Sequence, residues 1–110
     1  MWHWPNFSRA EVACRHCGEV LIHEPSMDAL QQLRNSLGPI RLTSAYRCPV
    51  HNALVGGAPL SQHKFGRAFD IILDYDKDEI HRLAEQAGFT GFGLHYKTFI
   101  HVDTGPRRTW

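Results

Sequence analysis

One apolar run in the middle of the chain contains an aspartate, and this feature constrains the fold more than any other. The run, Ala68 to Leu73, reads AFDIIL and is rich enough in large and branched apolar residues to form a buried β-strand. A carboxylate in such a strand is costly to bury unless a cation or hydrogen-bond donors meet it. Asp70 therefore predicts a compensating group beside this strand.

A second polar residue interrupts an apolar run near the C-terminus, where His101 lies between Ile100 and Val102. Side chains alternate along a strand, so His101 points to the face opposite its two neighbours. His63 lies shortly before Asp70, and the two histidines and the aspartate could converge if the two strands are neighbours. This is a ligand set of catalytic zinc. Histidines between apolar residues are also common as hydrogen-bonded core or surface groups, and spacing alone leaves both interpretations open.

The remaining signals predict an α+β domain with a small, mostly antiparallel sheet packed with helices. Capping residues and apolar periodicity predict helices over about 8–13, 26–38 and 76–88, the second capped by Ser26. Strands are expected over 40–44 and 68–73, followed by a hairpin or two neighbouring strands in FTGFGLHY and TFIHVDTG. The segment 45–68 is expected to be a long loop with a helical turn near Asn52, and loops of this length are usually functional.

Size and composition limit the function classes. The 110 residues, 43% of them hydrophobic, carry a formal net charge of +1 and fit one globular domain over 1–110. Without a basic run, we expect no nucleic-acid partner. No apolar stretch approaches the roughly 20 residues of a membrane span, and the N-terminus does not resemble a signal peptide. We therefore expect a monomer made in the cytoplasm.

The three cysteines, Cys14, Cys17 and Cys48, do not suggest a secreted disulfide framework because their number is odd. Together with His51 they form a C-x2-C plus C-x2-H set with the chemistry of a structural zinc site. Three free thiols, or one disulfide from Cys48 to Cys14 or Cys17, are the alternatives.

The stretch from Ser61 to Asp70, SQHKFGRAFD, matches the S-x-H-x-x-G-x-A-x-D pattern of the M15 zinc peptidases. The flanking segments TSAYRCPVHNALVGGAPLSQH and FIHVDTGPRRTW also resemble the short branch of this family found in bacterial cell-wall hydrolases and phage endolysins. The family comprises D-Ala-D-Ala carboxypeptidases and L-alanyl-D-glutamate endopeptidases of peptidoglycan metabolism. The resemblance covers nearly the whole chain and implies a fold like that of the hedgehog signalling domain and the DD-peptidases.

The resemblance also implies roles for individual residues. The implied zinc ligands are His63, Asp70 and His101, with water at the fourth position. Arg47 corresponds to an arginine beside the metal that can hold a substrate carboxylate or stabilise the oxyanion, and a solvated loop arginine is the alternative. Ser61 and Gln62 belong to the same motif and are expected to bind substrate or to shape the turn.

The sequence departs from the family pattern at the general base. Many members have Asp or Glu three residues before the last histidine ligand, where this chain has Thr98. Asp103, which shares a strand face with His101, is expected to act as the base or to orient an imidazole. His95 is the second candidate because the ordinary imidazole pKa of about 6.5 suits proton shuttling, although a surface histidine fits equally.

The implied function is zinc-dependent hydrolysis of peptide bonds in peptidoglycan stem peptides. A zinc-containing binding module of the same fold without hydrolytic activity is the alternative. A holin or a virion would bring the protein to the cell wall. The sequence leaves open which bond is cut, and whether the enzyme is a carboxypeptidase or an endopeptidase.

Overall fold

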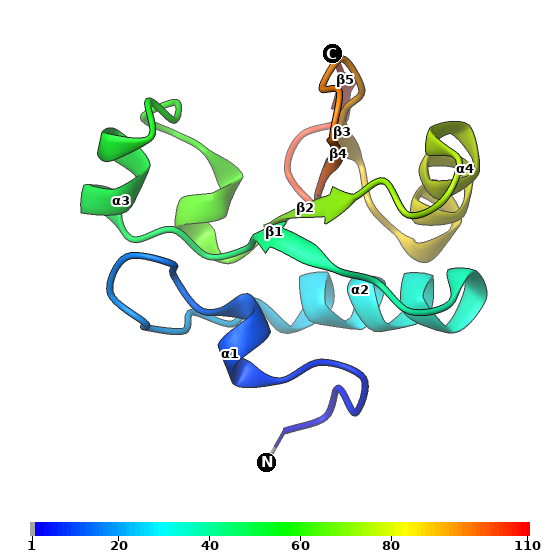
Figure 1. The fold of residues 1–110 in the computed structure, drawn as a ribbon, viewed down its shortest axis with the longest axis horizontal. Helices are drawn as coiled ribbons and strands as arrows, with labels where there is room; N and C mark the ends of the chain where they lie inside the picture. The colour runs from blue at the N-terminus through cyan, green and yellow to red at the C-terminus, as the bar shows by residue number, and fades with distance from the viewer. Residues whose placement is uncertain (1) are drawn as a thin grey trace.

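The computed structural model describes residues 2–110 and shows an α+β fold built on one five-stranded sheet (Figure 1). The elements follow in the order α1 (Arg9–Val12), α2 (Glu24–Leu37), β1 (Leu42–Ser44), α3 (Pro49–Leu54), the 3-10 helix η1 (Gln62–Phe65), β2 (Ala68–Ile72), α4 (Lys77–Ala87), β3 (Gly91–Gly93), β4 (Phe99–Asp103) and β5 (Arg108–Thr109). The strands are arranged in the order β1-β2-β4-β3-β5. Within 2–110, none of the helices has the length and apolar character needed to cross a membrane.

The sheet is mixed, which corrects the expectation of a mostly antiparallel sheet. The central strands β2 and β4 are antiparallel, as are β1 with β2 and β3 with β4. The predicted pairing of the two C-terminal segments is therefore confirmed. The added strand β5 was not predicted and runs parallel to β3, with Gly91 opposite Arg108. Its two residues are too few to show a strand period in the sequence.

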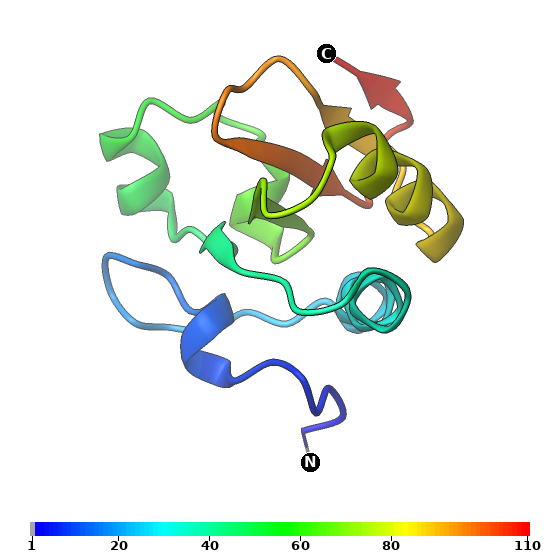
Figure 2. The same ribbon diagram turned by 45° about the vertical axis from the view of Figure 1, so that its right-hand side comes forward.

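The two faces of the sheet carry different side chains. In the register of β2 with β4, Phe69 lies opposite Val102 and Ile71 opposite Ile100, and these side chains belong to the hydrophobic core. Helices α2 and α4 pack together against this face (Figure 2). The alternate residues of the same strands point to the other face, which is left for the functional site.

Helices α1 and α4 begin where the sequence predicts. Ser8 and Glu11 form a capping box at α1, with both reciprocal hydrogen bonds present. The Asp76 side chain accepts from the backbone N–H of Glu79 at the start of α4, and Gly88 ends that helix at a φ of 113°.

The prediction that Ser26 caps α2 was wrong, because the helix begins earlier, after His23. Pro25 lies in the first turn, where its missing N–H costs nothing and its fixed φ suits a helix. Ser26 is instead buried inside the helix, with its hydroxyl 2.6 Å from His23 Nδ1 and 2.6 Å from Thr104 Oγ1.

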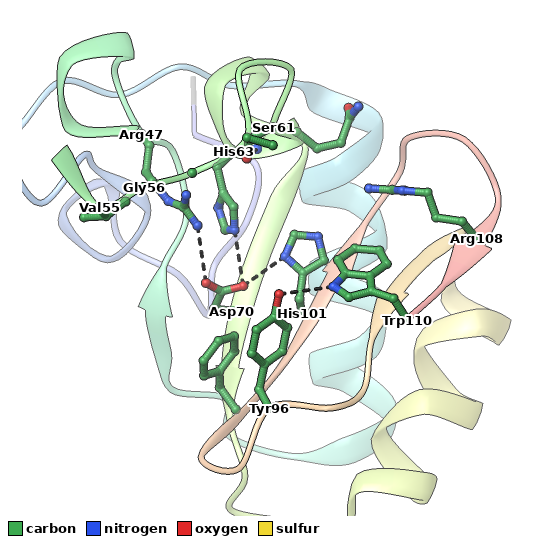
Figure 3. A pocket seen from close by; sticks show the side chains of 14 residues that line it. Arg47, Val55, Gly56, Ser61, His63, Asp70, Tyr96, His101, Arg108 and Trp110 are labelled. Atoms are coloured by element: carbon green, nitrogen blue, oxygen red, sulfur yellow. Dashed lines mark hydrogen bonds and ion pairs between the residues drawn. The ribbon is translucent and has the colours of Figure 1, made fainter. Parts of the chain in front are cut away.

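The segment predicted as a long loop contains two short helices. The expected helical turn near Asn52 is α3, and Cys48 caps it by accepting from the backbone N–H of His51. The 3-10 helix η1 is capped by Ser61, whose hydroxyl accepts from the backbone N–H of His63. Both helices lie on the side of the molecule where the functional site is found (Figure 3).

Candidate metal centre and active site

The structure brings the three predicted zinc ligands together. Antiparallel pairing places Asp70 opposite His101 on the free face of the sheet, and η1 delivers His63 from the segment before β2. His63 Nε2 lies 3.2 Å from Asp70 Oδ1, and His101 Nδ1 lies 3.1 Å from the same oxygen (Figure 3). All three side chains are buried, and their ligating atoms lie within 4.8 Å of one another.

In His63 and His101, the hydrogen bond made by the outer ring nitrogen fixes the tautomer, and so determines whether the inner nitrogen presents a lone pair to the cluster. His63 Nδ1 is 2.6 Å from the carbonyl oxygen of Ala45, which can only accept, so Nδ1 carries the proton and Nε2 presents a lone pair. His101 Nε2 likewise donates to Asp103 Oδ2 at 2.6 Å, so Nδ1 presents a lone pair. Two lone pairs and one carboxylate oxygen thus converge. They repel one another unless a cation or an extra proton lies between them, and this donor set fits Zn²⁺.

The electrostatics of the cluster favour positive charge. Burial acts to raise the pKa of Asp70, but the imidazoles of His101 and His63, which donate to Asp70 once their inner nitrogens are protonated, outweigh it and hold that pKa well below its usual range. Burial acts to lower the pKa of His101, but contacts with Asp103 and Asp70 outweigh it and raise that pKa. Asp70 is therefore ionised at neutral pH and offers its charge to a proton or a metal ion.

Gly66 allows the tight turn that carries the chain from η1 into β2. Its φ is 70°, in the left-handed region that favours glycine. A Cβ at this position would also collide with the backbone carbonyl oxygen of Leu21. The glycine of the motif is thus required by both conformation and space, and it fixes the approach of His63 to Asp70.

Asp103 is fully buried beneath the metal-ligand cluster. Its Oδ2 accepts from His101 Nε2 at 2.6 Å and Arg108 Nη2 at 2.8 Å, and its Oδ1 accepts from Arg108 Nη1 at 2.9 Å and the N–H of Gly105 at 3.0 Å. Burial acts to raise the pKa of Asp103, but the hydrogen bonds from His101 and Arg108 outweigh it and lower that pKa to about 2. A carboxylate engaged in this way is a weak proton acceptor, and its geometry suits orienting His101.

A cavity of about 480 Å³ opens over the cluster and is lined in part by three further predicted residues, Arg47, Ser61 and Gln62. Arg47 Nη2 lies 3.7 Å from Asp70 Oδ2, and its Nη1 donates to Asn52 Oδ1 at 3.0 Å. Within 2–110, Gln62 Oε1 is buried without a hydrogen-bond partner. The cavity therefore presents the Arg47 guanidinium and the unpaired Gln62 oxygen beside the three candidate metal ligands.

Sequence reasoning missed three cavity-lining residues whose side chains can hydrogen-bond: Tyr96, Arg108 and Trp110. The Tyr96 hydroxyl accepts from Trp110 Nε1 at 3.1 Å, and the Trp110 ring centroid lies 5.0 Å from that of His101 (Figure 3). Arg108 and Trp110 lie in the segment FIHVDTGPRRTW, whose resemblance to the family assigned them no role, and Tyr96 lies outside the segments that carry that resemblance. Their place in the cavity depends on the short strand β5 and on the connection between β3 and β4.

The two candidates for the general base lie outside the cavity lining. His95 is exposed, and its ring is tilted by 33° against that of the adjacent residue Tyr96, with centroids 4.2 Å apart. Asp103 lies behind His101, as described above. Among the cavity-lining residues of the described chain, the only carboxylate is that of Asp70.

Comparison with known proteins gives the family. The model of the family described as Peptidase M15 matches residues 5–103, which is most of the chain and includes all three residues of the metal-ligand cluster. The comparison with curated proteins found no match. The convergence of two imidazoles and a carboxylate in a polar cavity agrees with what a peptidase of this kind requires, and the chain belongs to the peptidase M15 family.

Proposed function

We propose that this chain is a zinc-dependent peptidase that hydrolyses peptide bonds in peptidoglycan stem peptides, as a cell-wall hydrolase or endolysin. His63, Asp70 and His101 would hold the zinc ion. The observation that carries the proposal is the convergence of three metal-ligating atoms, with the second nitrogen of each ring already donating to an acceptor. On the ground of family membership, we also assign the fold to the hedgehog/DD-peptidase type.

Bound zinc supplies Lewis-acid chemistry, because it lowers the pKa of a coordinated water toward 7 and polarises a carbonyl. The chain's own residues bind and orient the peptide around it. Arg47 places a guanidinium where it can pair with a substrate carboxylate or with the oxyanion. Because the Tyr96 oxygen accepts from Trp110, its own O–H is free to donate to substrate. Gln62 Oε1 can accept a peptide N–H.

Asp103 acts in this proposal as a positioning residue. It keeps His101 in the tautomer that exposes Nδ1, and Arg108 fixes the carboxylate from the other side. Ser61 shapes the turn that presents His63, since its hydroxyl accepts from the His63 backbone N–H at 3.3 Å.

One observation favours the alternative of a zinc-containing binding module without hydrolytic activity. The cavity-lining residues of the described chain include no carboxylate beyond the ligand Asp70, and Thr98 is exposed. A module of this kind would bind the stem peptide through Arg47 and Gln62 and leave it intact.

Digestion of purified sacculi tests the proposal. We expect the protein to release stem-peptide fragments, a chelator to stop the release and added zinc to restore it, with the new termini identified by mass spectrometry. Free D-Ala would identify a carboxypeptidase, and a new D-Glu amino terminus an L-alanyl-D-glutamate endopeptidase.

Substitution of a ligand provides the matched comparison. His63→Ala should abolish release, whereas His3→Ala, which removes an exposed imidazole far along the chain from the cluster, should leave it unchanged. Full chelator-sensitive activity in His63→Ala would refute the ligand assignment. Zinc-dependent binding of sacculi without any release would identify the binding module.

A further inference from the structure

A second cluster of metal-ligating side chains lies outside the cavity. Cys14 follows α1, Cys17 closes the next turn, and Cys48 caps α3; their sulfur atoms lie within 4.8 Å of one another and form no disulfide. Figures 1 and 2 both show the loop after α1 beside the segment that leads into α3. We propose that Cys14, Cys17, Cys48 and His16 bind a second, structural zinc ion.

The backbone around the sulfur atoms is arranged to stabilise thiolates. Cys14 Sγ accepts from the N–H groups of His16 and Cys48, each at 3.4 Å, and Cys48 Sγ accepts from the N–H of His51 at 3.4 Å. Zinc binds the deprotonated thiolate, so donors aimed at sulfur support a site of this chemistry.

His16 supplies the fourth ligand. Its Nδ1 lies 3.9 Å from Cys48 Sγ. In a tetrahedral zinc site, the bond lengths place sulfur and nitrogen ligands about 3.6 Å apart and two sulfur ligands about 3.8 Å apart. The sequence spacing favoured His51 for this role, but the His51 ring stacks on that of His16, with centroids 5.8 Å apart and planes at 6°. His51 therefore covers the ligand ring.

The turn that carries the C-x2-C pair has the shape such a site needs. The N–H of Gly18 donates to the carbonyl oxygen of Cys14 at 2.9 Å, and Gly18 has a φ of 75°. This tight turn brings Cys17 back beside Cys14, and the N–H of Cys48 then approaches the same sulfur from a position 34 residues later. The ligands thus come from two segments that only the fold brings together.

The segment that this zinc ion would fix is weakly held by apolar contacts. Helix α3 exposes Val50 and Leu54, at 59% and 69% of their accessible surface. Arg47, one residue before Cys48, lines the catalytic cavity, and its N–H donates to the carbonyl oxygen of His63 at 3.0 Å. A zinc ion joining residues 14 and 48 would close a long loop and hold that wall of the cavity in place.

Cobalt substitution distinguishes this site from the catalytic one. Protein freed of metal and reloaded with Co²⁺ should show a thiolate-to-cobalt charge-transfer band in the near ultraviolet, which the His63–Asp70–His101 cluster cannot produce because it has no sulfur. Protein purified without added metal should contain about two zinc ions per chain, and His101→Ala should keep about one. Two zinc ions with no activity on sacculi would support this site while the proposed function failed.

Three variants test the ligands. Cys17→Ser changes an exposed side chain and should lose the charge-transfer band and about one zinc ion per chain, with a lower melting temperature. His16→Ala should lose the same ion, whereas His51→Ala should retain it. Loss in His51→Ala alone would overturn the assignment of His16.

Two results would overturn the site itself. One is cobalt-loaded wild-type protein without the charge-transfer band and with three thiols open to alkylation. The other is protein purified under reducing conditions whose mass is lower by two hydrogen atoms, which would show a disulfide in place of the metal. The first measurement needs no variant, so a folding defect in Cys17→Ser cannot obscure it.

Discussion

At the scale of single residues, substitution of Asp103 tests whether this carboxylate orients His101 or acts as the general base. Asp103→Asn removes the charge that pairs with Arg108 and weakens the bond to His101 Nε2. We expect the zinc concentration for half-maximal activity to rise about 10- to 100-fold, because partners behind a ligand tune metal affinity. Asp78→Asn, on the exposed surface of α4, is the control. A loss of turnover of about 100-fold with unchanged zinc dependence would instead identify Asp103 as the base.

His101 should make the zinc affinity of the site fall as the pH decreases. Its pKa is raised by Asp103 and Asp70 against the effect of burial, and its protonated ring cannot bind metal at Nδ1. Zinc affinity should therefore fall as pH decreases, beginning above the ordinary imidazole pKa of about 6.5. The dissociation constant for zinc, measured across pH in Cys17→Ser so that the proposed second site does not contribute, gives the pH at which the affinity begins to fall. An affinity that stays constant from neutral pH down to 6.5 would contradict the geometry described for His101.

The site residues that could be predicted from the sequence lie in regular apolar strands, whereas those that could not lie in irregular or very short segments. Asp70 and His101 interrupt apolar strands, and the cost of burying them is visible in the sequence alone. Tyr96, Arg108 and Trp110 occupy irregular or very short segments, where no strand or helix period marks them and where the family resemblance assigned them no role. Their place in the cavity follows from strand pairing, which is a property of the folded chain.

At the scale of elements, β3 is a strand whose glycines leave room for the groups behind the ligands. A Cβ at Gly91 would lie 2.6 Å from Cγ of Asp103 and would also collide with Arg108 Nη1. Gly91→Ala should lower the free energy of unfolding by about 1 to 3 kcal/mol through overpacking. It should also weaken zinc binding by displacing Asp103.

Urea unfolding and the zinc dependence of activity measure these two effects. Thr109→Ala, at an exposed position of the neighbouring strand β5, is the control and should change neither. Unchanged stability and zinc dependence in Gly91→Ala would show that the Asp103–Arg108 pair moves freely, and would contradict a positioning role for it.

The helices show what capping signals can and cannot predict. Ser8 and Asp76 each lie directly before their helix, and both caps were predicted. In α2 the serine follows a proline, and the first turn is set by the fixed φ of Pro25 before Ser26 is reached. Side-chain caps identify a helix start only when no backbone constraint acts earlier.

At the scale of the whole molecule, the central pair of strands separates core from site. Phe69 and Val102 pack against α2 and α4. Asp70 and His101, which alternate with them along the same strands, lie on the opposite face. The α+β class follows from sequence patterns, whereas the adjacency of β2 and β4 was only a condition there and is a finding of the structure. The mixed topology does not, because the parallel pairing of β5 is set by the turn after Asp103.

This alternation has a consequence for how the protein reaches its native state. If β2 slipped by one residue against β4, Asp70 would turn into the hydrophobic layer and Phe69 into the cavity. A slipped strand pair would carry an uncompensated charge among apolar side chains and would separate Asp70 from His101. Asp70 and His101 therefore favour the native alignment of the two strands, since only this alignment keeps both polar side chains out of the hydrophobic core and beside each other.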